Sequence, residues 1–284
     1  MGVTDCHVHI NPLWEMRPAA RALLEAERSD RETLEAYLRE PERFLAYLDR
    51  AGVERAVLVN YVSPEVVGYT ERSNDFVLDY VHGHTDRLIA VGSVDPRTHP
   101  DPRGALRELK GRGLRAVKLH PPHQLFFPDA YRPERGGDVR LSELYSTCEE
   151  LALPVIFHTG TSIFPGARDK YGQPLLIEDV AIDFPKLTIV LAHGGRPLWT
   201  GEAQYLCRRF PNVFLEVSSV PPARLLDYFP ELPRLSERVL FGSDWPGPGV
   251  KDLGENLARF RQLPLGEERL RRILEENPRK VFPD

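Results

Sequence analysis

Cysteine, basic clusters and long apolar runs are all scarce in this 284-residue chain. Its three cysteines have no C-x-x-C spacing, so they indicate neither a disulfide framework nor a cysteine zinc site. No apolar run approaches the roughly 20 residues that a membrane-spanning helix requires. The 37 Lys and Arg residues are outnumbered by 42 Asp and Glu residues, and they form no basic cluster that would attract a phosphate backbone or an anionic membrane. We therefore expect neither nucleic acid nor membrane as a partner.

Two further signals are missing near the N-terminus. No charged segment followed by an apolar one stands there, so no secretory signal is indicated and we expect a cytoplasmic protein. No G-x-G-x-x-G turn follows the first β-rich run, where the sequence reads His9-Ile10-Asn11-Pro12. This absence argues against a doubly wound nucleotide-binding sheet.

Short β-rich runs alternate with segments of helical periodicity along the whole chain. Several of these runs are apolar throughout, as in parallel strands that helices cover on both sides. Eight such units without a phosphate-binding loop predict an α/β fold, a single (β/α)8 TIM barrel over residues 1–284. The expected strands are 2–8, 55–60, 88–93, 114–120, 154–158, 187–193, 212–217 and 238–244.

Irregular segments rich in proline and glycine follow four of these strands. They are 11–18 after the first strand, 121–137 after the fourth, 159–174 after the fifth and 245–249 after the eighth. The active site of a barrel is built from the loops at the carboxyl ends of its strands. We therefore expect these extended loops to form the walls of a site rather than linkers between domains.

The first expected strand carries a His-x-His pair. Within Asp5-Cys6-His7-Val8-His9, the alternation of a strand places Asp5, His7 and His9 on one face and Cys6 and Val8 on the other. Two imidazoles on one face can share a metal ion at about 2.0–2.1 Å each. Such a pair arises often by chance, so its meaning depends on the strands that follow.

Three later strands also end in a side chain that can bind a metal. His158 ends the fifth expected strand, His193 the sixth and Asp244 the eighth, so all three meet His7 and His9 at the mouth of a barrel. Three imidazoles and a carboxylate with an open position suit zinc, which lowers the pKa of a bound water to about 7. In this arrangement His7, His9 and His158 are neutral ligands. Asp244 binds the ion and also accepts a proton from the water.

Five motifs spread over the expected strands carry a family resemblance. They are His7-x-His9, Val-Lys-Leu-His-Pro at 117–121, Phe-His158-Thr-Gly, Leu-Ala-His193-Gly-Gly and Leu-Phe-Gly-Ser-Asp244-Trp-Pro. In this order they resemble the amidohydrolase superfamily, and most closely its amidohydrolase-related branch, typified by aminocarboxymuconate-semialdehyde decarboxylase. The resemblance implies one divalent ion on His7, His9, His158 and Asp244, with His193 beside the water as an acid, base or electrostatic group. It also implies either hydrolysis or non-oxidative decarboxylation, and assembly as a homodimer.

Lys118 leaves the number of metal ions open. It shares the inward face of the fourth expected strand with Ala116 and His120. In two-metal members of the superfamily a carbamylated lysine on this strand bridges the ions, so the resemblance leaves room for a second ion here. The alternative is that Lys118 pairs with a substrate carboxylate or with Asp5.

Other side chains near the strand ends are expected to line the pocket or to support the ligands. Glu216 on the seventh expected strand is expected to support the metal ligands from below. The expected substrate contacts are Asn60, Tyr61, His120, Arg196 and Trp245, and the arginines considered as anion anchors are Arg17, Arg168 and Arg196. No metal role is expected for His82, His84, His99 and His123.

These residues favour a metal-dependent hydrolase of a small ester, lactone or amide. The metal would polarise the carbonyl group, while His193 and Asp244 transfer protons. The alternative enzyme is a decarboxylase of a carboxylated aromatic or muconate-like substrate, which requires an anion-binding residue beside the metal. A non-catalytic binding barrel would be expected to have lost a ligand, and every expected ligand is present. Zinc is the favoured ion, with manganese, iron and cobalt as alternatives.

Overall fold

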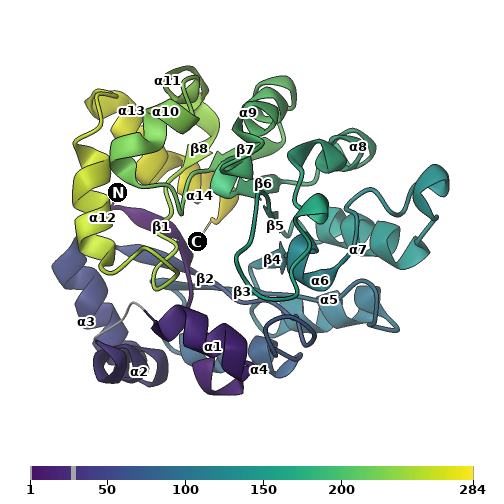
Figure 1. The fold of residues 1–284 in the computed structure, drawn as a ribbon, viewed down its shortest axis with the longest axis horizontal. Helices are drawn as coiled ribbons and strands as arrows, with labels where there is room; N and C mark the ends of the chain where they lie inside the picture. Colours follow the sequence, from purple (N-terminus) through teal and green to yellow (C-terminus); the bar gives the residue numbers. More distant parts are fainter. Residues whose placement is uncertain (1, 27–29, 284) are drawn as a thin grey trace.

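The computed structural model describes residues 2–26 and 30–283. Within these residues eight parallel strands form one sheet in the order β1 to β8, with helices around it (Figure 1). The strands are β1 Thr4–Val8, β2 Arg55–Val59, β3 Leu88–Gly92, β4 Ala116–Leu119, β5 Val155–His158, β6 Ile189–Ala192, β7 Val213–Glu216 and β8 Val239–Leu240. Each strand lies within the segment where the sequence predicts it.

The sheet closes into a barrel where its first and last strands meet. Cys6 N donates to Phe241 O at 2.9 Å, and His9 N donates to Trp245 O at 2.7 Å. β8 has only two residues with regular strand pairing, but residues 241–245 continue beside β1 through these bonds. The predicted (β/α)8 barrel is therefore confirmed, with a shorter eighth strand than expected.

Helices pack around the outside of the barrel, and local sequence signals mark several of their ends. α3 begins at Pro41 and ends before Gly52, whose φ of 71° suits glycine at a helix C-terminus. Asp101 accepts a hydrogen bond from Gly104 N at the start of α5. In the described part of the chain, no helix combines the length and apolar character needed to cross a membrane.

The helices have the following bounds: α1 Pro18–Glu25, α2 Arg31–Arg39, α3 Pro41–Ala51, α4 Arg72–Val81, α5 Pro102–Gly111, α6 Pro121–Gln124, α7 Val139–Glu150, α8 Glu178–Asp183, α9 Thr200–Arg209, α10 Leu225–Tyr228, α11 Leu232–Leu235, α12 Leu253–Arg261, α13 Glu267–Arg271 and α14 Asn277–Val281. Short 3-10 turns lie in the strand-end loops, including one at Leu13–Glu15 and one at Asp169–Tyr171. The irregular segments after β1, β4 and β5 thus contain short ordered turns.

The apolar core has two parts. The larger part packs the outward faces of the strands against the helices. The smaller part fills the lower interior of the barrel, where Val57, Ile89, Ile156 and Val190 meet Phe282 just beyond α14. This filled interior leaves the carboxyl ends of the strands as the open end of the barrel.

β1 departs from the expected alternation. Its pairing with β2 shifts register between Asp5 and Val8, so Cys6 lies in the interior cluster while Val8 packs outside. Asp5 Oδ1 accepts hydrogen bonds from His7 N at 3.1 Å and Ser243 N at 2.9 Å. The prediction that Cys6 and Val8 share a face is wrong, because the irregularity interrupts the period of two.

Candidate metal-dependent active site

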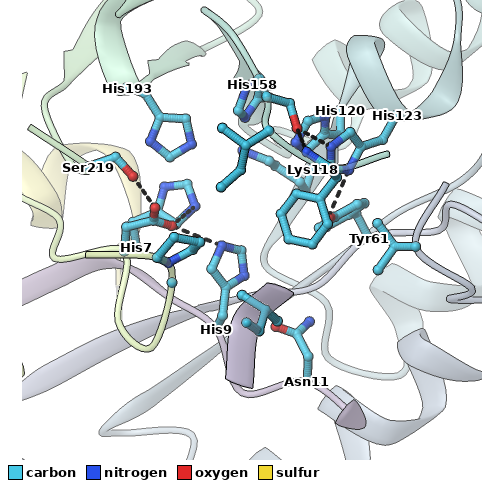
Figure 2. A pocket seen from close by; sticks show the side chains of 18 of the residues that line it. His7, His9, Asn11, Tyr61, Lys118, His120, His123, His158, His193 and Ser219 are labelled. Carbon is cyan, nitrogen blue, oxygen red and sulfur yellow. Dashed lines mark hydrogen bonds and ion pairs between the residues drawn. The ribbon is translucent and has the colours of Figure 1, made fainter. Parts of the chain in front are cut away.

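A cavity of about 300 Å³ opens at the carboxyl ends of the strands (Figure 2). Its apolar wall comes from the segments after β1, β2, β5 and β8, through Leu13, Met16, Leu24, Val67, Ile163, Phe164, Pro246 and Pro248. Among the described residues, six histidines line the cavity, namely His7, His9, His120, His123, His158 and His193. The irregular loops after β1, β5 and β8 therefore form walls, as expected, whereas the loop expected at 121–137 after β4 contributes only His123 to the described lining.

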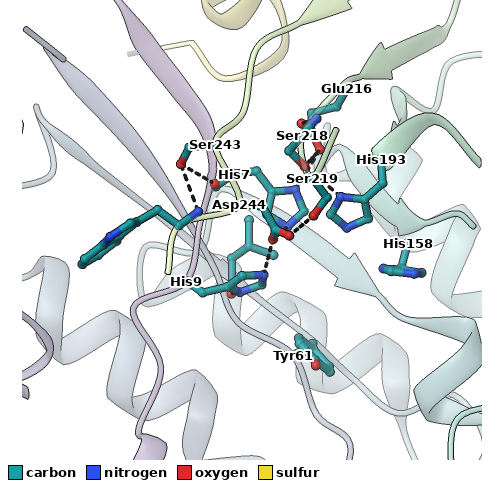
Figure 3. Close-up of polar contacts among 12 residues, drawn as sticks. His7, His9, Tyr61, His158, His193, Glu216, Ser218, Ser219, Ser243 and Asp244 are labelled. Atoms are coloured by element: carbon teal, nitrogen blue, oxygen red, sulfur yellow. Dashed lines mark hydrogen bonds and ion pairs between the residues drawn. The ribbon is translucent and has the colours of Figure 1, made fainter. Parts of the chain in front are cut away.

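His7, His9 and Asp244 meet on one side of this cavity (Figure 3). His9 Nε2 lies 3.1 Å and His7 Nε2 lies 3.7 Å from Asp244 Oδ1. The other carboxylate oxygen of Asp244 accepts a hydrogen bond from Ser219 Oγ. Three of the four predicted metal ligands thus point toward one another.

Glu216 contacts His7 directly and reaches His193 through Ser218, as Figure 3 shows. Its Oε2 accepts a hydrogen bond from His7 Nδ1 at 2.8 Å and another from Ser218 Oγ at 3.0 Å. Ser218 Oγ in turn lies 2.8 Å from His193 Nδ1, from which it accepts. The expected support role of Glu216 therefore extends through Ser218 to His193.

The backbone around these side chains is constrained. A Cβ atom at Gly242 would stand 2.5 Å from Glu216 Oε1 and 2.7 Å from His7 Cβ, so only glycine allows this approach. His193 and Asp244 adopt φ values of 63° and 66°, which are strained for residues with a side chain. Such strain is typical of functional sites, where the surrounding structure holds the backbone in place.

The donor atoms fit a divalent cation. His7 Nδ1 donates to the Glu216 carboxylate and His9 Nδ1 donates to Val59 O at 2.9 Å, so each Nε2 carries a lone pair toward Asp244. His7 Nε2 is buried and has no hydrogen-bond partner among the described residues. Two ligand atoms at about 2.0–2.1 Å from a tetrahedral ion lie about 3.3 Å apart. The Nε2 atoms of His7 and His9 lie 3.7 Å and 3.1 Å from Asp244 Oδ1, close to that value. Two imidazoles and a carboxylate are ligands that zinc and related ions accept.

His193 lies nearer to this group than the sequence predicts. His7, His193 and Asp244 each offer one ligand atom, and these three atoms all lie within 4.8 Å of one another. Among the described residues, these three are therefore close enough together to hold one metal ion. His193 Nδ1 is occupied by Ser218, so its Nε2 carries the lone pair. His193 is thus placed either to bind an ion or to exchange a proton beside one.

His158 lies at the end of β5, as predicted, but outside that three-residue group. Its ring stacks on His120 with 3.8 Å between centroids, and the His193 ring lies 4.7 Å away. His158 Nε2 donates to Thr161 O at 3.4 Å, so the lone pair belongs on Nδ1. The side chain therefore keeps a free ligand atom next to His193.

His123 lines the cavity although the sequence analysis assigned it no role. Its ring stacks on His120 at 3.5 Å, Nδ1 lies 3.1 Å from Tyr61 Oη, and Nε2 lies 2.7 Å from Ser162 Oγ. The single turn of α6 places residues three apart on one face. The spacing His-Pro-Pro-His was the signal that could have revealed this stack.

Lys118 projects from β4 and is 1% exposed. Its Nζ has no hydrogen-bond partner in the described parts of the chain, so the alternative in which Lys118 pairs with Asp5 is not formed. Burial lowers the pKa of Lys118 to about 8, although the carboxylates of Glu216 and Asp244 act in the opposite direction. The buried amine therefore loses its proton more readily than an exposed lysine does.

The surroundings of the site lower the pKa values of two histidines and of Asp244, which favours neutral imidazoles and an ionised carboxylate. Burial lowers the pKa of His158 and that of His193 well below the usual value, and the charge of Lys118 adds to this effect. Burial acts to raise the pKa of Asp244, but its contacts with His7, His9 and Ser219 hold this pKa below the ordinary value. His158 and His193 are therefore held as neutral imidazoles and Asp244 as a carboxylate, the forms in which both side chains bind metals.

Trp245 does not line the cavity, although the sequence analysis expected it to contact the substrate. Its side chain is 1% exposed and lies among aromatic rings, 5.8 Å from Phe44 and 5.4 Å from Tyr47 between centroids. Because Asp244 points into the barrel, the next residue points outward. The structure therefore contradicts the expected substrate contact of Trp245 and places it behind the loop.

Some of the remaining residues that the sequence analysis expected to contact the substrate line the cavity, and the others are bonded elsewhere. Arg196 and Tyr61 line the cavity. Asn60, just after β2, accepts a hydrogen bond from Asn11 and donates one to Ile10 O, both in the segment after β1. Arg17 and Arg168 donate to backbone carbonyl groups elsewhere. Of the three arginines considered as anchors, Arg196 is the one in the described lining of the cavity.

Comparison with known proteins agrees with this fold and site. The family model described as Amidohydrolase matches residues 4–283. This chain therefore belongs to the amidohydrolase family and is an enzyme of that family, whose members typically bind divalent metal ions.

Individual relatives differ in their reactions. The chain is 27% identical over 267 residues to a 4-sulfomuconolactone hydrolase from Hydrogenophaga intermedia, covering 85% of this chain and 78% of the relative. An uncharacterized TIM-barrel protein from Bordetella bronchiseptica is similar in structure, with a TM-score of 0.75, 25% identity and coverage of 99% and 98%. A 2,6-dihydroxybenzoate decarboxylase shares the fold, with a TM-score of 0.66, 16% identity and 99% coverage of both chains.

Proposed function

We propose that the protein is a metal-dependent hydrolase that opens a small lactone by adding water to its carbonyl group. The observation that carries this proposal is the convergence of the Nε2 lone pairs of His7 and His9 on Asp244 at the floor of the cavity. The relative that hydrolyses 4-sulfomuconolactone supports a lactone as the substrate. The cavity of about 300 Å³ suits a small molecule.

We assign His7, His9, His158 and Asp244 as the ligands of the ion. A divalent ion there would supply Lewis acidity, which polarises a carbonyl group and makes water more acidic. Zinc is the ion we propose, because three imidazoles and a carboxylate suit it. Manganese, iron and cobalt are the alternative outcomes of elemental analysis, and two ions per chain would assign Lys118 to a bridging position.

His193 transfers the proton in this proposal. Its Nε2 lone pair faces the site because Nδ1 donates to Ser218, so it accepts a proton as water attacks the carbonyl carbon. The ring C–O bond then breaks, and His193 returns that proton to the leaving oxygen. Water is consumed and an open-chain hydroxy acid, or its keto tautomer, results.

Decarboxylation is the second candidate, and one observation favours it. That reaction requires a cation beside the metal to hold the substrate carboxylate, and Lys118 and Arg196 both line the cavity. The two reactions differ in their products, because only decarboxylation releases carbon dioxide.

The test combines elemental analysis with product analysis. We expect about one zinc ion per chain, ring opening of butenolides followed by NMR, and no carbon dioxide. His7→Ala and His158→Ala should lose both ion and activity. His193→Ala should keep most of the ion but react about 10²- to 10⁴-fold more slowly. Full turnover by either ligand variant would contradict the assignment, and release of carbon dioxide from carboxylated aromatics would favour decarboxylation.

The homodimer and the cytoplasmic location implied earlier remain predictions. Light scattering of the zinc-loaded protein measures the first, and fractionation of the source cells measures the second.

A further inference from the structure

We propose that His123 is a positioning residue, which fixes the loop after β5 as a wall of the cavity and so determines how tightly the substrate is held. This inference deepens the proposed function, and its kinetic part rests on that function. His123 belongs to the single turn of α6, whereas the loop that it contacts, residues 159–174, follows β5. The two segments meet at the cavity, because both contribute to its lining.

The ring of His123 connects two loops through its two nitrogen atoms. Nδ1 lies 3.1 Å from Tyr61 Oη, just after β2, and Nε2 lies 2.7 Å from Ser162 Oγ in the loop after β5. Figure 2 shows the ring beside His120 and close to Tyr61. A hydroxyl group can both donate and accept, so either neutral tautomer of the ring keeps both hydrogen bonds. The connection therefore does not depend on which nitrogen carries the proton.

His123 is itself held firmly on α6. Its carbonyl oxygen accepts from Ser63 Oγ at 3.2 Å, and its N donates to His120 O at 2.8 Å. The residue is 2% exposed, and its ring stacks on that of His120 with 3.5 Å between centroids. The rotational freedom of the side chain is thus already restricted, so its bond to Ser162 orders the loop at little further entropic cost.

The loop after β5 is tied to the barrel at its base. Gly160 N donates to Gly172 O at 2.8 Å, and Thr161 N donates to Arg196 O at 3.0 Å. These are backbone bonds, so they do not depend on the side chains of the loop. The base should therefore keep its place when a side chain of the tip, residues 162–168, is changed.

Two hydrogen bonds tie this tip to α6. At one end Arg168 N donates to Pro122 O at 2.9 Å. At the other end Ser162 Oγ bonds to His123. The first bond involves the backbone, whereas the second joins two side chains and can be removed by substitution. Loss of the second would release the half of the tip that follows Ser162.

Ile163 and Phe164 lie in that half and line the cavity. Ile163 is 63% exposed, so packing holds it weakly. The Phe164 ring meets the His123 ring edge to face, with 5.3 Å between centroids, and Phe164 N donates to Ser162 Oγ at 3.3 Å. The bond between Ser162 and His123 therefore fixes the part of the tip that faces the substrate.

Limited proteolysis tests this role without any substrate. Arg168 and Lys170 are exposed, so trypsin can cut the loop there when the tip opens. Ser162→Ala should speed this cleavage about 3- to 10-fold, the factor that corresponds to one ordinary hydrogen bond. Ser146→Ala is the matched control, because that hydroxyl bonds to Glu143 O within α7, and it should be cut at the wild-type rate.

Two variants of His123 separate hydrogen bonding from packing. The amide group of glutamine reaches about as far as Nε2, that of asparagine about as far as Nδ1, and neither keeps the ring stack with His120. His123→Gln should therefore retain most of the resistance to trypsin, whereas His123→Asn should be cut as fast as Ser162→Ala. Equal cleavage of the two His123 variants, or wild-type cleavage of Ser162→Ala, would overturn the proposal.

A double variant shows whether the two side chains act through the same bond. His123→Asn combined with Ser162→Ala should be cut no faster than either single variant, because each change removes the same interaction. Effects that multiply in the double variant would mean that the two residues act independently, and would overturn the proposal.

Kinetics of the zinc-loaded protein test the effect on the substrate. Ser162→Ala and His123→Asn should raise KM for a butenolide about 3- to 10-fold and keep kcat within about twofold of wild type. The reason is that contact with the wall is made equally before and during the reaction, while the proposed metal ligands and His193 are unchanged. Zinc content should equal that of wild type. A fall in kcat at constant KM, or no change in either constant, would overturn the role of His123 in holding the wall.

Failure of the proposed function has a different signature. If wild type opens no lactone, the hydrolase proposal fails for this class, while trypsin cleavage still decides the role of His123. Faster cleavage of Ser162→Ala and His123→Asn than of His123→Gln would uphold the link between α6 and the loop. Equal cleavage of all variants would overturn it.

Discussion

The carboxylate of Glu216 orients two histidines of the site at once. It accepts a hydrogen bond from His7 Nδ1, and through Ser218 it sets the position of His193. A carboxylate can accept both bonds on one oxygen, whereas an amide nitrogen in that place donates and cannot accept either. Metal affinity and proton transfer are therefore coupled through one side chain.

Substitutions at these two positions should separate the two effects. Ser218→Ala removes only the link to His193, so we expect kcat to fall about 10- to 100-fold while zinc affinity is kept. Glu216→Gln should lower zinc affinity by a similar factor as well, because the amide has one acceptor oxygen for two donors, His7 Nδ1 and Ser218 N, that the carboxylate accepts on separate oxygens. Competition with a zinc chelator and steady-state kinetics measure the two quantities. Wild-type zinc affinity in Glu216→Gln would contradict the role of Glu216 in orienting His7.

Sequence analysis located the residues at strand ends better than those in loops. His7, His9, His193 and Asp244 meet because the carboxyl ends of parallel strands always share one side of a barrel. His123 was missed because it reaches the cavity through the turn of α6, which strand periodicity does not describe. The nearness of His193 to Asp244 also depends on left-handed backbone conformations that the sequence does not reveal.

At the scale of elements, the loop after β8 is fixed by packing against helix α3 on the outside of the barrel rather than by contacts in the cavity. Trp245 packs against Phe44 and Tyr47 of α3, and its carbonyl accepts a hydrogen bond from His9 N. The aromatic cluster thus links an outer helix to the segment that carries Asp244. The sequence predicted the loop correctly but not which of its side chains face inward.

Removing this indole should destabilise the fold. Trp245→Ala leaves a cavity among aromatic rings, and such truncations lower the free energy of unfolding by about 3–5 kcal/mol. Trp14→Ala is a matched control, because that indole is 38% exposed and should change stability much less. Denaturant unfolding of the zinc-loaded variants measures both, and equal losses would contradict the role assigned to the cluster.

At the scale of the whole molecule, the proposed ligands join distant parts of the barrel. His7 and His9 come from β1, His158 from β5 and Asp244 from beyond β8. An ion bound only by the folded chain stabilises it by about 2.7 kcal/mol at a free concentration 100 times the Kd. The sequence predicted this architecture, because eight β-rich runs alternate with helical segments along the chain and several of these runs are apolar throughout.

Removal of the ion should therefore lower the melting temperature. We expect a decrease of a few degrees after dialysis against a chelator, with recovery when zinc is added back. His7→Ala should melt at one temperature with or without zinc. Differential scanning calorimetry measures the shift, and an identical melting temperature for the two forms of wild type would contradict a metal site that spans the barrel.

The closure between β1 and β8 also bears on how the protein acquires its site during folding. The bond from Ser243 N to Asp5 joins residues 238 positions apart, and contacts of such separation form slowly because a long loop must close first. Individual βα units can form without them, but His7 and Asp244 cannot meet until the ring is complete. Uptake of the ion by refolding chains would consequently report the last long-range step of folding rather than the appearance of secondary structure.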